Sequence, residues 1–258
     1  MAINGRNYSP VGPDEKMKIE ETKVGGGSSK ALNLGKVFGI MFIWLLLTAG
    51  ISFGLGYLFF LWLQSGGETA RNGMFAILIG SGIGLIILTF VIQFFALKKG
   101  KGMLIMSLIY VLFMGVLCST LVLFIDWYIL GVALGITTAI FGVLALIGLV
   151  AKNIKPIAMV GLMLVIGAAM TGLITWLIIL FTGVTGTSAT ILWIVNFAMF
   201  AGMLLLIIVD MHQIGKICER GEVSTNLTLY CALTLYTDFI YIFIRIAYYL
   251  AIAFGRSK

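Results

Sequence analysis

The chain has 258 residues, of which 61% are hydrophobic and only 10% are charged. Ordinary soluble domains hold roughly 45–50% apolar and about 25% charged residues, so this chain cannot cover a water-facing surface. The formal net charge of +7 does not indicate nucleic-acid binding, because the basic residues lie in short gaps between apolar runs. The composition predicts an all-α, polytopic membrane protein and excludes a soluble domain.

Residues 1–36 are polar and rich in Gly, Ser, Lys and Glu. They lack the short apolar core and the cleavage site of a signal peptide. This composition predicts a flexible cytoplasmic N-terminal tail, followed by a transmembrane bundle over residues 37–258.

Seven apolar runs follow the tail, and each is near or above the roughly 20 residues that cross a bilayer as a helix. The runs are 37–63, 74–97, 103–125, 128–151, 156–182, 189–209 and 229–254. Helices are favoured because lipid offers no partner to backbone polar groups, and continuous runs exclude the alternating pattern of a barrel. We predict a seven-helix transmembrane bundle. A six-span chain with a re-entrant last segment is the alternative.

The positions of Lys and Arg predict the orientation, because cytoplasmic loops near the spans carry an excess of both. Thirteen lie in the tail and in alternate gaps, whereas the opposite set holds three, which are Arg71, Arg256 and Lys258. We expect the N-terminus in the cytoplasm and the C-terminus outside. Both an endomembrane and, in a bacterium, the plasma membrane fit this chain.

Small residues recur four apart in three of the runs. The pairs are Gly50 and Gly54, Gly80 and Gly84, and Gly131 and Gly135. Such spacing lets backbones approach closely inside a membrane. Because glycine is also common in spans generally, the pattern predicts a compact bundle and assigns no specific contacts.

The seventh run carries a polar stripe. Four residues follow helical i, i+4, i+7, i+11 spacing and so share one face, namely Thr234, Asp238, Tyr241 and Arg245. Lipid cannot face such a stripe, so we expect the last helix to be central and enclosed by the other six. A static ion pair between Asp238 and Arg245 is the alternative role for the two charges.

A second carboxylate, Asp210, closes the sixth run on the side where the seventh begins. The carboxyls of Asp210 and Asp238 could therefore approach each other. Two carboxylates in a poorly solvated site cannot both ionise cheaply, so the two would share a proton and titrate as a pair. This predicts a pH sensor made of Asp210 and Asp238. The alternative is that Asp210 is a solvated residue at the end of a helix.

Two stretches carry these aspartates, DMHQIGKI at 210–217 and LYCALTLYTDFIYIFIR at 229–245. They resemble the transmembrane Bax inhibitor motif family. In that family the sixth span ends in an aspartate followed by a Gln-containing polar stretch, and the seventh begins with Leu-Tyr, a small residue, Leu-Tyr and Asp-Phe-Ile. The matching residues here are Asp210, Gln213, Leu235, Tyr236, Asp238, Phe239 and Ile240.

The resemblance implies six helices around a central seventh and a proton-sensitive calcium leak gated by Asp210 and Asp238. It also implies that the ionised pair contacts calcium, which prefers oxygen ligands. No cofactor is expected, and calcium is the permeant ion. The chain departs from the family at Tyr241, where Asn is common, and at Arg245, because the family's basic residue lies further along. The second run has no basic residue to lock the aspartates, although Gln93 could donate a hydrogen bond.

Catalysis is not expected, because the single histidine, His212, lies next to the bilayer edge, where an interfacial residue is the simpler interpretation. A proton-coupled secondary transporter is the strongest competing function, since its spans also carry isolated carboxylates. A third is a non-conducting regulatory protein that binds membrane-protein partners through the tail and the loop 211–228. The expected partners are the lipid bilayer, calcium ions and protons, and not nucleic acid.

Overall fold

The computed structural model describes residues 13–96, 102–182, 186–219 and 223–255, and the elements in these ranges are all α-helices. They are α1 (Pro13–Ala96), α2 (Gly102–Phe124), α3 (Trp127–Val150), α4 (Lys155–Thr182), α5 (Gly186–Glu219) and α6 (Thr225–Gly255). Each of the six contains a stretch long and apolar enough to cross a membrane. The predicted all-α membrane fold is confirmed.

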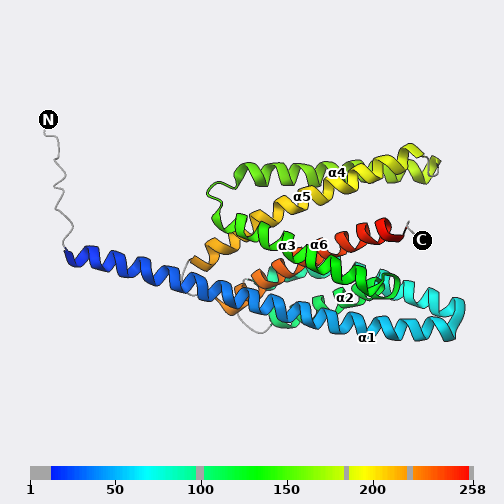
Figure 1. The fold of residues 1–258 in the computed structure, drawn as a ribbon, viewed down its shortest axis with the longest axis horizontal. Coiled ribbons are helices and arrows are strands. Elements are labelled where there is room, and N and C mark those ends of the chain that lie inside the picture. Colours follow the sequence, from blue (N-terminus) through cyan, green and yellow to red (C-terminus); the bar gives the residue numbers. More distant parts are fainter. Residues whose placement is uncertain (1–12, 97–101, 183–185, 220–222, 256–258) are drawn as a thin grey trace.

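Helix α1 supplies two of the predicted spans. Its apolar part, Lys30–Ala96, has 67 residues. At about 1.5 Å per residue it would be about 100 Å long if straight, against a hydrocarbon core of about 30 Å. It folds back at Gly67, whose φ of 52° and ψ of −131° suit glycine because a Cβ would be strained there (Figure 1). The first arm (13–66) and the second arm (68–96) are separated by this kink instead of the polar loop expected after residue 63.

Helix α2 packs against both arms of α1. The Ser52 hydroxyl in the first arm donates a hydrogen bond of 3.1 Å to the backbone oxygen of Gly115 in α2. Gly84 in the second arm faces the ring of Phe113, which would lie 2.6 Å from an added Cβ. The two arms and α2 therefore form one side of the bundle.

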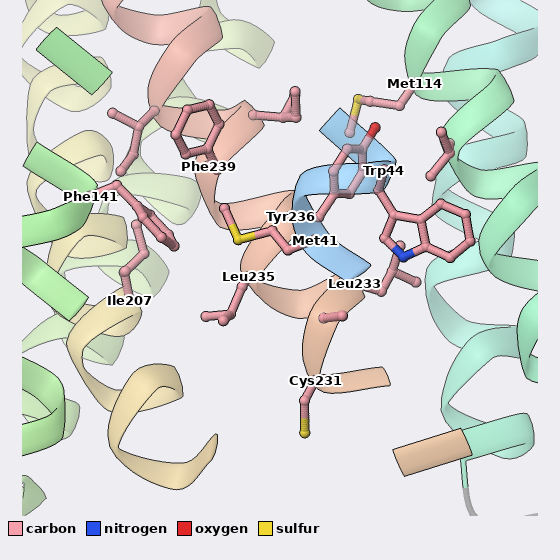
Figure 2. Packing of buried hydrophobic residues seen from close by; sticks show 14 of the residues in the cluster. Met41, Trp44, Met114, Phe141, Ile207, Cys231, Leu233, Leu235, Tyr236 and Phe239 are labelled. Atoms are coloured by element: carbon pink, nitrogen blue, oxygen red, sulfur yellow. The ribbon is translucent and has the colours of Figure 1, made fainter. Parts of the chain in front are cut away.

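Helix α6 is the central helix, as predicted. It contacts α1, α2, α3 and α5, and it is the most buried of the spans although it is the least apolar. Figure 2 shows buried side chains of α6 among those of its neighbours, which are Trp44 from α1, Met114 from α2, Phe141 from α3 and Ile207 from α5. A span enclosed by protein needs no apolar surface toward lipid, so α6 can carry the polar stripe.

Helix α4 lies outside this arrangement. Among the described helices it packs against α5 alone, so the expected ring of all six helices around the last is not complete (Figure 1). A Cβ at Gly202 of α5 would lie 2.9 Å from side-chain atoms of Leu164 and Val165 of α4, so the glycine lets the two helices approach closely. The remaining surface of α4 exposes large apolar side chains, including Met163 and Met170, which must face lipid.

The N-terminal part of α1 is fixed to the end of α5. Lys30 forms an ion pair with Glu219, and the Asn33 side-chain amide donates to the backbone oxygen of Cys218 at 3.3 Å. We call this the Lys30 end of the bundle and the opposite end the Gly67 end. Helix α1 begins at Pro13, inside the predicted tail, whose flexibility stays a prediction.

A buried hydrogen bond joins the first arm of α1 to α6. The hydroxyl oxygens of Thr48 and Tyr236 lie 2.6 Å apart, and Thr48 Oγ1 also lies 2.9 Å from the backbone oxygen of Trp44. A threonine has one hydroxyl proton, so Thr48 donates to Trp44 and accepts from Tyr236.

Thr48→Val should therefore leave the Tyr236 hydroxyl buried without a partner. We expect a loss of about 1–3 kcal/mol in the free energy of unfolding, measured by denaturant titration in detergent. The control is Thr138→Val, because the exposed Thr138 hydroxyl bonds only within its own helix, to Leu134. The double variant Thr48→Val with Tyr236→Phe should recover part of the loss, and an additive loss would contradict this assignment.

Candidate functional site

A cavity of ≈ 170 Å³ lies between the second arm of α1, α2 and α6. Its lining is Thr89, Ile92, Gln93, Tyr110, Tyr230, Leu233, Thr234, Thr237 and Asp238. Gln93 is close to the end of α1 and Tyr230 is close to the start of α6, so the cavity begins near the Lys30 end. From Tyr230 it follows α6 inward to Asp238, a rise of about 12 Å over two turns.

Asp238 lies at the inner limit of this cavity. The residue is 8% exposed, and its Oδ2 atom is buried without a hydrogen-bond partner among the described residues. A buried carboxylate without partners is costly, since nothing replaces the water that it gives up. An unpartnered polar atom beside a cavity lined with hydroxyls therefore marks a place where an ion, a proton or water can be bound.

The second predicted carboxylate, Asp210, does not line the cavity but lies in electrostatic range of Asp238. Asp210 is half-buried on α5 and interacts electrostatically with Asp238 and with Tyr230. The titratable side chains around Asp238 are thus Asp210 from α5, Tyr110 from α2 and Tyr230 from its own helix. Basic side chains are absent from this part of the described chain.

The sequence placed Asp210 at the end of the sixth span, but the helix continues beyond it. Helix α5 continues for nine residues to Glu219. The continuation has its own buried face, formed by Met211, Ile214 and Cys218. Residues 211–219 are therefore a packed part of α5 and residues 225–228 belong to α6, so only 220–224 of the predicted loop 211–228 lie between the two helices.

His212 is buried inside the protein, and its predicted position near the bilayer edge stays a prediction. It is 8% exposed, and its Nδ1 atom lies 3.2 Å from the backbone oxygen of Gly148 on α3. The absence of a side chain at Gly148 permits this approach, because a Cβ there would lie 2.6 Å from the backbone oxygen of Ile208. This contact fixes the part of α5 that carries Asp210 against α3.

The predicted polar stripe faces two different neighbours. Thr234 and Asp238 line the cavity, whereas Tyr241 and Arg245 are turned to α5. Arg245 donates a hydrogen bond to the side-chain oxygen of Asn196, and its guanidinium lies 5.3 Å from the centroid of the Tyr241 ring. The alternative ion pair between Asp238 and Arg245 is therefore not formed.

Asn196 and part of the cavity were not predicted from the sequence. Asn196 is the one amide side chain in the sixth apolar run. A single amide among apolar residues could have indicated a polar contact inside the bundle. Gln93 was expected near the aspartates, and it does line the cavity with Asp238. Thr237, on the face of α6 next to Asp238, could have been found from its spacing of three residues to Thr234.

We expect Asn196→Ala to destabilise the protein by about 1.5–3 kcal/mol, because the Arg245 guanidinium loses its acceptor in a poorly solvated place. Thermal unfolding in detergent measures the effect. Asn153→Ala is the matched control, since the exposed Asn153 accepts only a long 3.3 Å bond from the nearby backbone N–H of Lys155. A loss in Asn196→Ala no larger than in this control would show that the Arg245 contact does not hold α5 to α6.

The described residues contain no group of three or more His, Cys, Asp or Glu side chains that could hold a metal ion. Calcium takes six to eight oxygen ligands in typical protein sites. Asp210 and Asp238, with the threonine hydroxyls of the cavity, offer oxygen atoms that a passing cation can contact. The arrangement suits transient contact better than a resident ion.

The family model described as "Inhibitor of apoptosis-promoting Bax1" matches residues 31–255 of the chain. This range covers α1 from its apolar part onward and all the other helices to the end of α6. No curated protein and no solved structure matches the chain.

Proposed function

Since the chain belongs to the family of inhibitors of apoptosis-promoting Bax1, we propose that it is a pH-sensitive calcium leak channel gated by Asp210 and Asp238. The observation that carries the proposal is the buried carboxyl of Asp238 at the inner limit of the cavity. Its Oδ2 atom has no hydrogen-bond partner among the described residues, and Asp210 lies in electrostatic range. We further propose a cytoplasmic N-terminus, on the excess of Lys and Arg at the Lys30 end, and the plasma membrane as the location in a bacterium.

The cavity supplies the first part of an ion path. A cation enters near Gln93 and Tyr230 and is attracted along the hydroxyls toward Asp238. The attraction is stronger there than in water, because charges interact more strongly in a medium of low dielectric constant. One turn past Asp238 along α6, Ile242 is fully buried, and the lining of the cavity does not continue toward the Gly67 end.

The aspartate pair couples protons to the closing of this path. A proton shared by Asp210 and Asp238 lets one carboxyl donate a hydrogen bond to the other and draws α5 and α6 together. Loss of that proton leaves two like charges in a poorly solvated place, which repel each other and attract calcium. The pair thus biases an equilibrium between closed and open arrangements of α5 and α6. Gln93 lines the cavity from α1, and the described lining contains no basic side chain that would compete with calcium.

Calcium flux into liposomes that contain the purified protein tests the proposal. A leak channel should dissipate an imposed calcium gradient without a co-substrate and should change its rate between about pH 6 and about pH 8. A proton-coupled transporter should saturate and require a counter-ion or solute. A non-conducting regulatory protein should give no flux and should crosslink to a membrane-protein partner. Either of the last two results would overturn the leak assignment.

A further inference from the structure

A second cavity, separate from the aspartate site, lies at the Lys30 end between the first arm of α1 and the start of α6. It measures ≈ 340 Å³, room for about ten water molecules at roughly 30 Å³ each. No residue of its lining belongs to the cavity of Asp238. We call it the Lys36 groove, after the one charged residue in its lining.

One half of the groove is polar. Lys36 is exposed and forms no ion pair with the described residues. Thr225 is the first residue of α6, and its exposed hydroxyl borders the same space. The start of a helix carries a partial positive charge, which adds to that of Lys36. This half therefore offers hydrogen-bond donors and positive potential.

The other half is apolar. Gly39, Ile40 and Ile43 continue the groove along α1, and Ile43 is 60% exposed. From Lys36 to Ile43 the helix rises about 10 Å, and over that distance the lining changes from charged to apolar. Because the apolar run of the first span begins at residue 37, this change marks the boundary between headgroups and hydrocarbon.

The described charges at this end of the bundle are mainly positive. The charged side chains described at the Lys30 end are Lys30, Lys36, Lys152, Lys155, Lys216 and Glu219. The one acidic side chain among them, Glu219, is paired with Lys30. Lys36, the one charged residue of the described lining, favours an anion in the groove over the ammonium of a choline headgroup. Basic pockets between transmembrane helices commonly bind the headgroups of anionic lipids.

We propose that the Lys36 groove binds one anionic phospholipid. Lys36 and Thr225 hold the phosphate oxygens, and Ile40 and Ile43 lie along the first part of an acyl chain. A phosphate has only acceptor oxygens, which match the ammonium and hydroxyl donors of this half. The bound lipid connects α1 to α6 at the end where the cavity of Asp238 begins. This site does not depend on whether the protein conducts calcium.

Native mass spectrometry of the protein in detergent tests the site, with titration of phosphatidylglycerol and, separately, phosphatidylcholine. The native chain should bind one phosphatidylglycerol more tightly than phosphatidylcholine. Lys36→Gln should weaken phosphatidylglycerol binding about fivefold, the size expected for one Lys near an anionic headgroup. Thr225→Val should weaken it about twofold through the lost hydrogen bond. Lys36→Arg should keep the affinity, because it keeps the charge.

Lys155→Gln is the matched control, since Lys155 is an exposed lysine at the same end of the bundle and outside the groove. Equal weakening by Lys36→Gln and Lys155→Gln would overturn the proposal in favour of diffuse surface attraction. Competition by inorganic phosphate at equal concentration would show that the groove takes a soluble phosphate and not a lipid. If Lys36→Gln is not recovered folded, Thr225→Val decides, and an unchanged affinity in that variant overturns the site.

Discussion

Replacing Asp238 by asparagine should remove the pH dependence of calcium flux in protein-loaded liposomes. Asparagine has the shape of a protonated carboxyl and cannot lose a proton. Between about pH 6 and about pH 8, the flux of Asp238→Asn should therefore stay at the level that the native protein shows at its acid limit. At the basic limit the native protein and the variant should differ by about tenfold, which corresponds to about 1.4 kcal/mol in the gating equilibrium.

Asp210→Asn should flatten the pH response in the same way, because the proposed sensor is a pair of carboxyls that lie in electrostatic range and share a proton. Asp238→Glu keeps a titratable group and should keep a pH response. Asp126→Asn is the matched control, since Asp126 is exposed just before α3 at the Gly67 end. A native pH response in Asp238→Asn would remove Asp238 from the sensor and leave the fold and the family assignment intact.

The aspartate pair was accessible from the sequence because charges inside apolar runs are rare. A charged side chain in hydrocarbon carries a large free-energy cost, and this makes Asp210 and Asp238 conspicuous in the sequence. A carboxylate in a span needs a position inside the bundle, however the helices are arranged. The i, i+4, i+7, i+11 pattern of the last run then predicted that α6 is enclosed, and the structure places it at the centre. Both inferences follow from the exclusion of polar groups from lipid.

The predicted loop began too early, at residue 211, because the first polar residues after the apolar run were interpreted as the end of the helix. Helix α5 ends at Glu219. Residues 211–219 carry a buried face at helical i, i+3, i+7 spacing, formed by Met211, Ile214 and Cys218, which packs inside the bundle. A span can continue past the apolar run as an amphipathic helix when protein covers one of its faces. The burial of His212 could not be predicted from the sequence in the same way, since it depends on Gly148, which lies 64 residues away.

Glycine spacing gave little information on contacts. Of the six glycines found four residues apart, only Gly84 has another side chain within 4 Å of an added Cβ. The same test shows open space at the others, which are Gly50, Gly54, Gly80, Gly131 and Gly135. Small residues permit close approach but do not choose a partner, because the partner depends on the face that tertiary packing brings near.

Gly148 is one of the glycines at which close approach is required. An ideal Cβ at this position would lie 2.6 Å from the backbone oxygen of Ile208 and 2.8 Å from the Cβ of Met211. These atoms belong to the rigid part of α5 and cannot turn away as the end of a long side chain can. Any larger residue must therefore push α3 away from α5.

We expect Gly148→Ala to lower the free energy of unfolding by about 1–3 kcal/mol, and Gly148→Leu to lower it by more, as overpacked cores do. Thermal and denaturant unfolding in detergent measure both. The matched control is Gly135→Ala on the same helix, where nothing lies within 4 Å and alanine improves helix propensity. That control should be neutral or stabilising by up to about 1 kcal/mol.

The same substitution links packing to function. Pushing α5 off α3 moves Asp210, two residues from His212, relative to Asp238 on α6, so the pH response of calcium flux should weaken in Gly148→Ala even in molecules that remain folded. Gly135→Ala should keep the native response. A stable Gly148→Ala protein with unchanged pH response would mean that the position of α5 is not set by its contact with α3, and that the aspartates keep their relation through α6 alone.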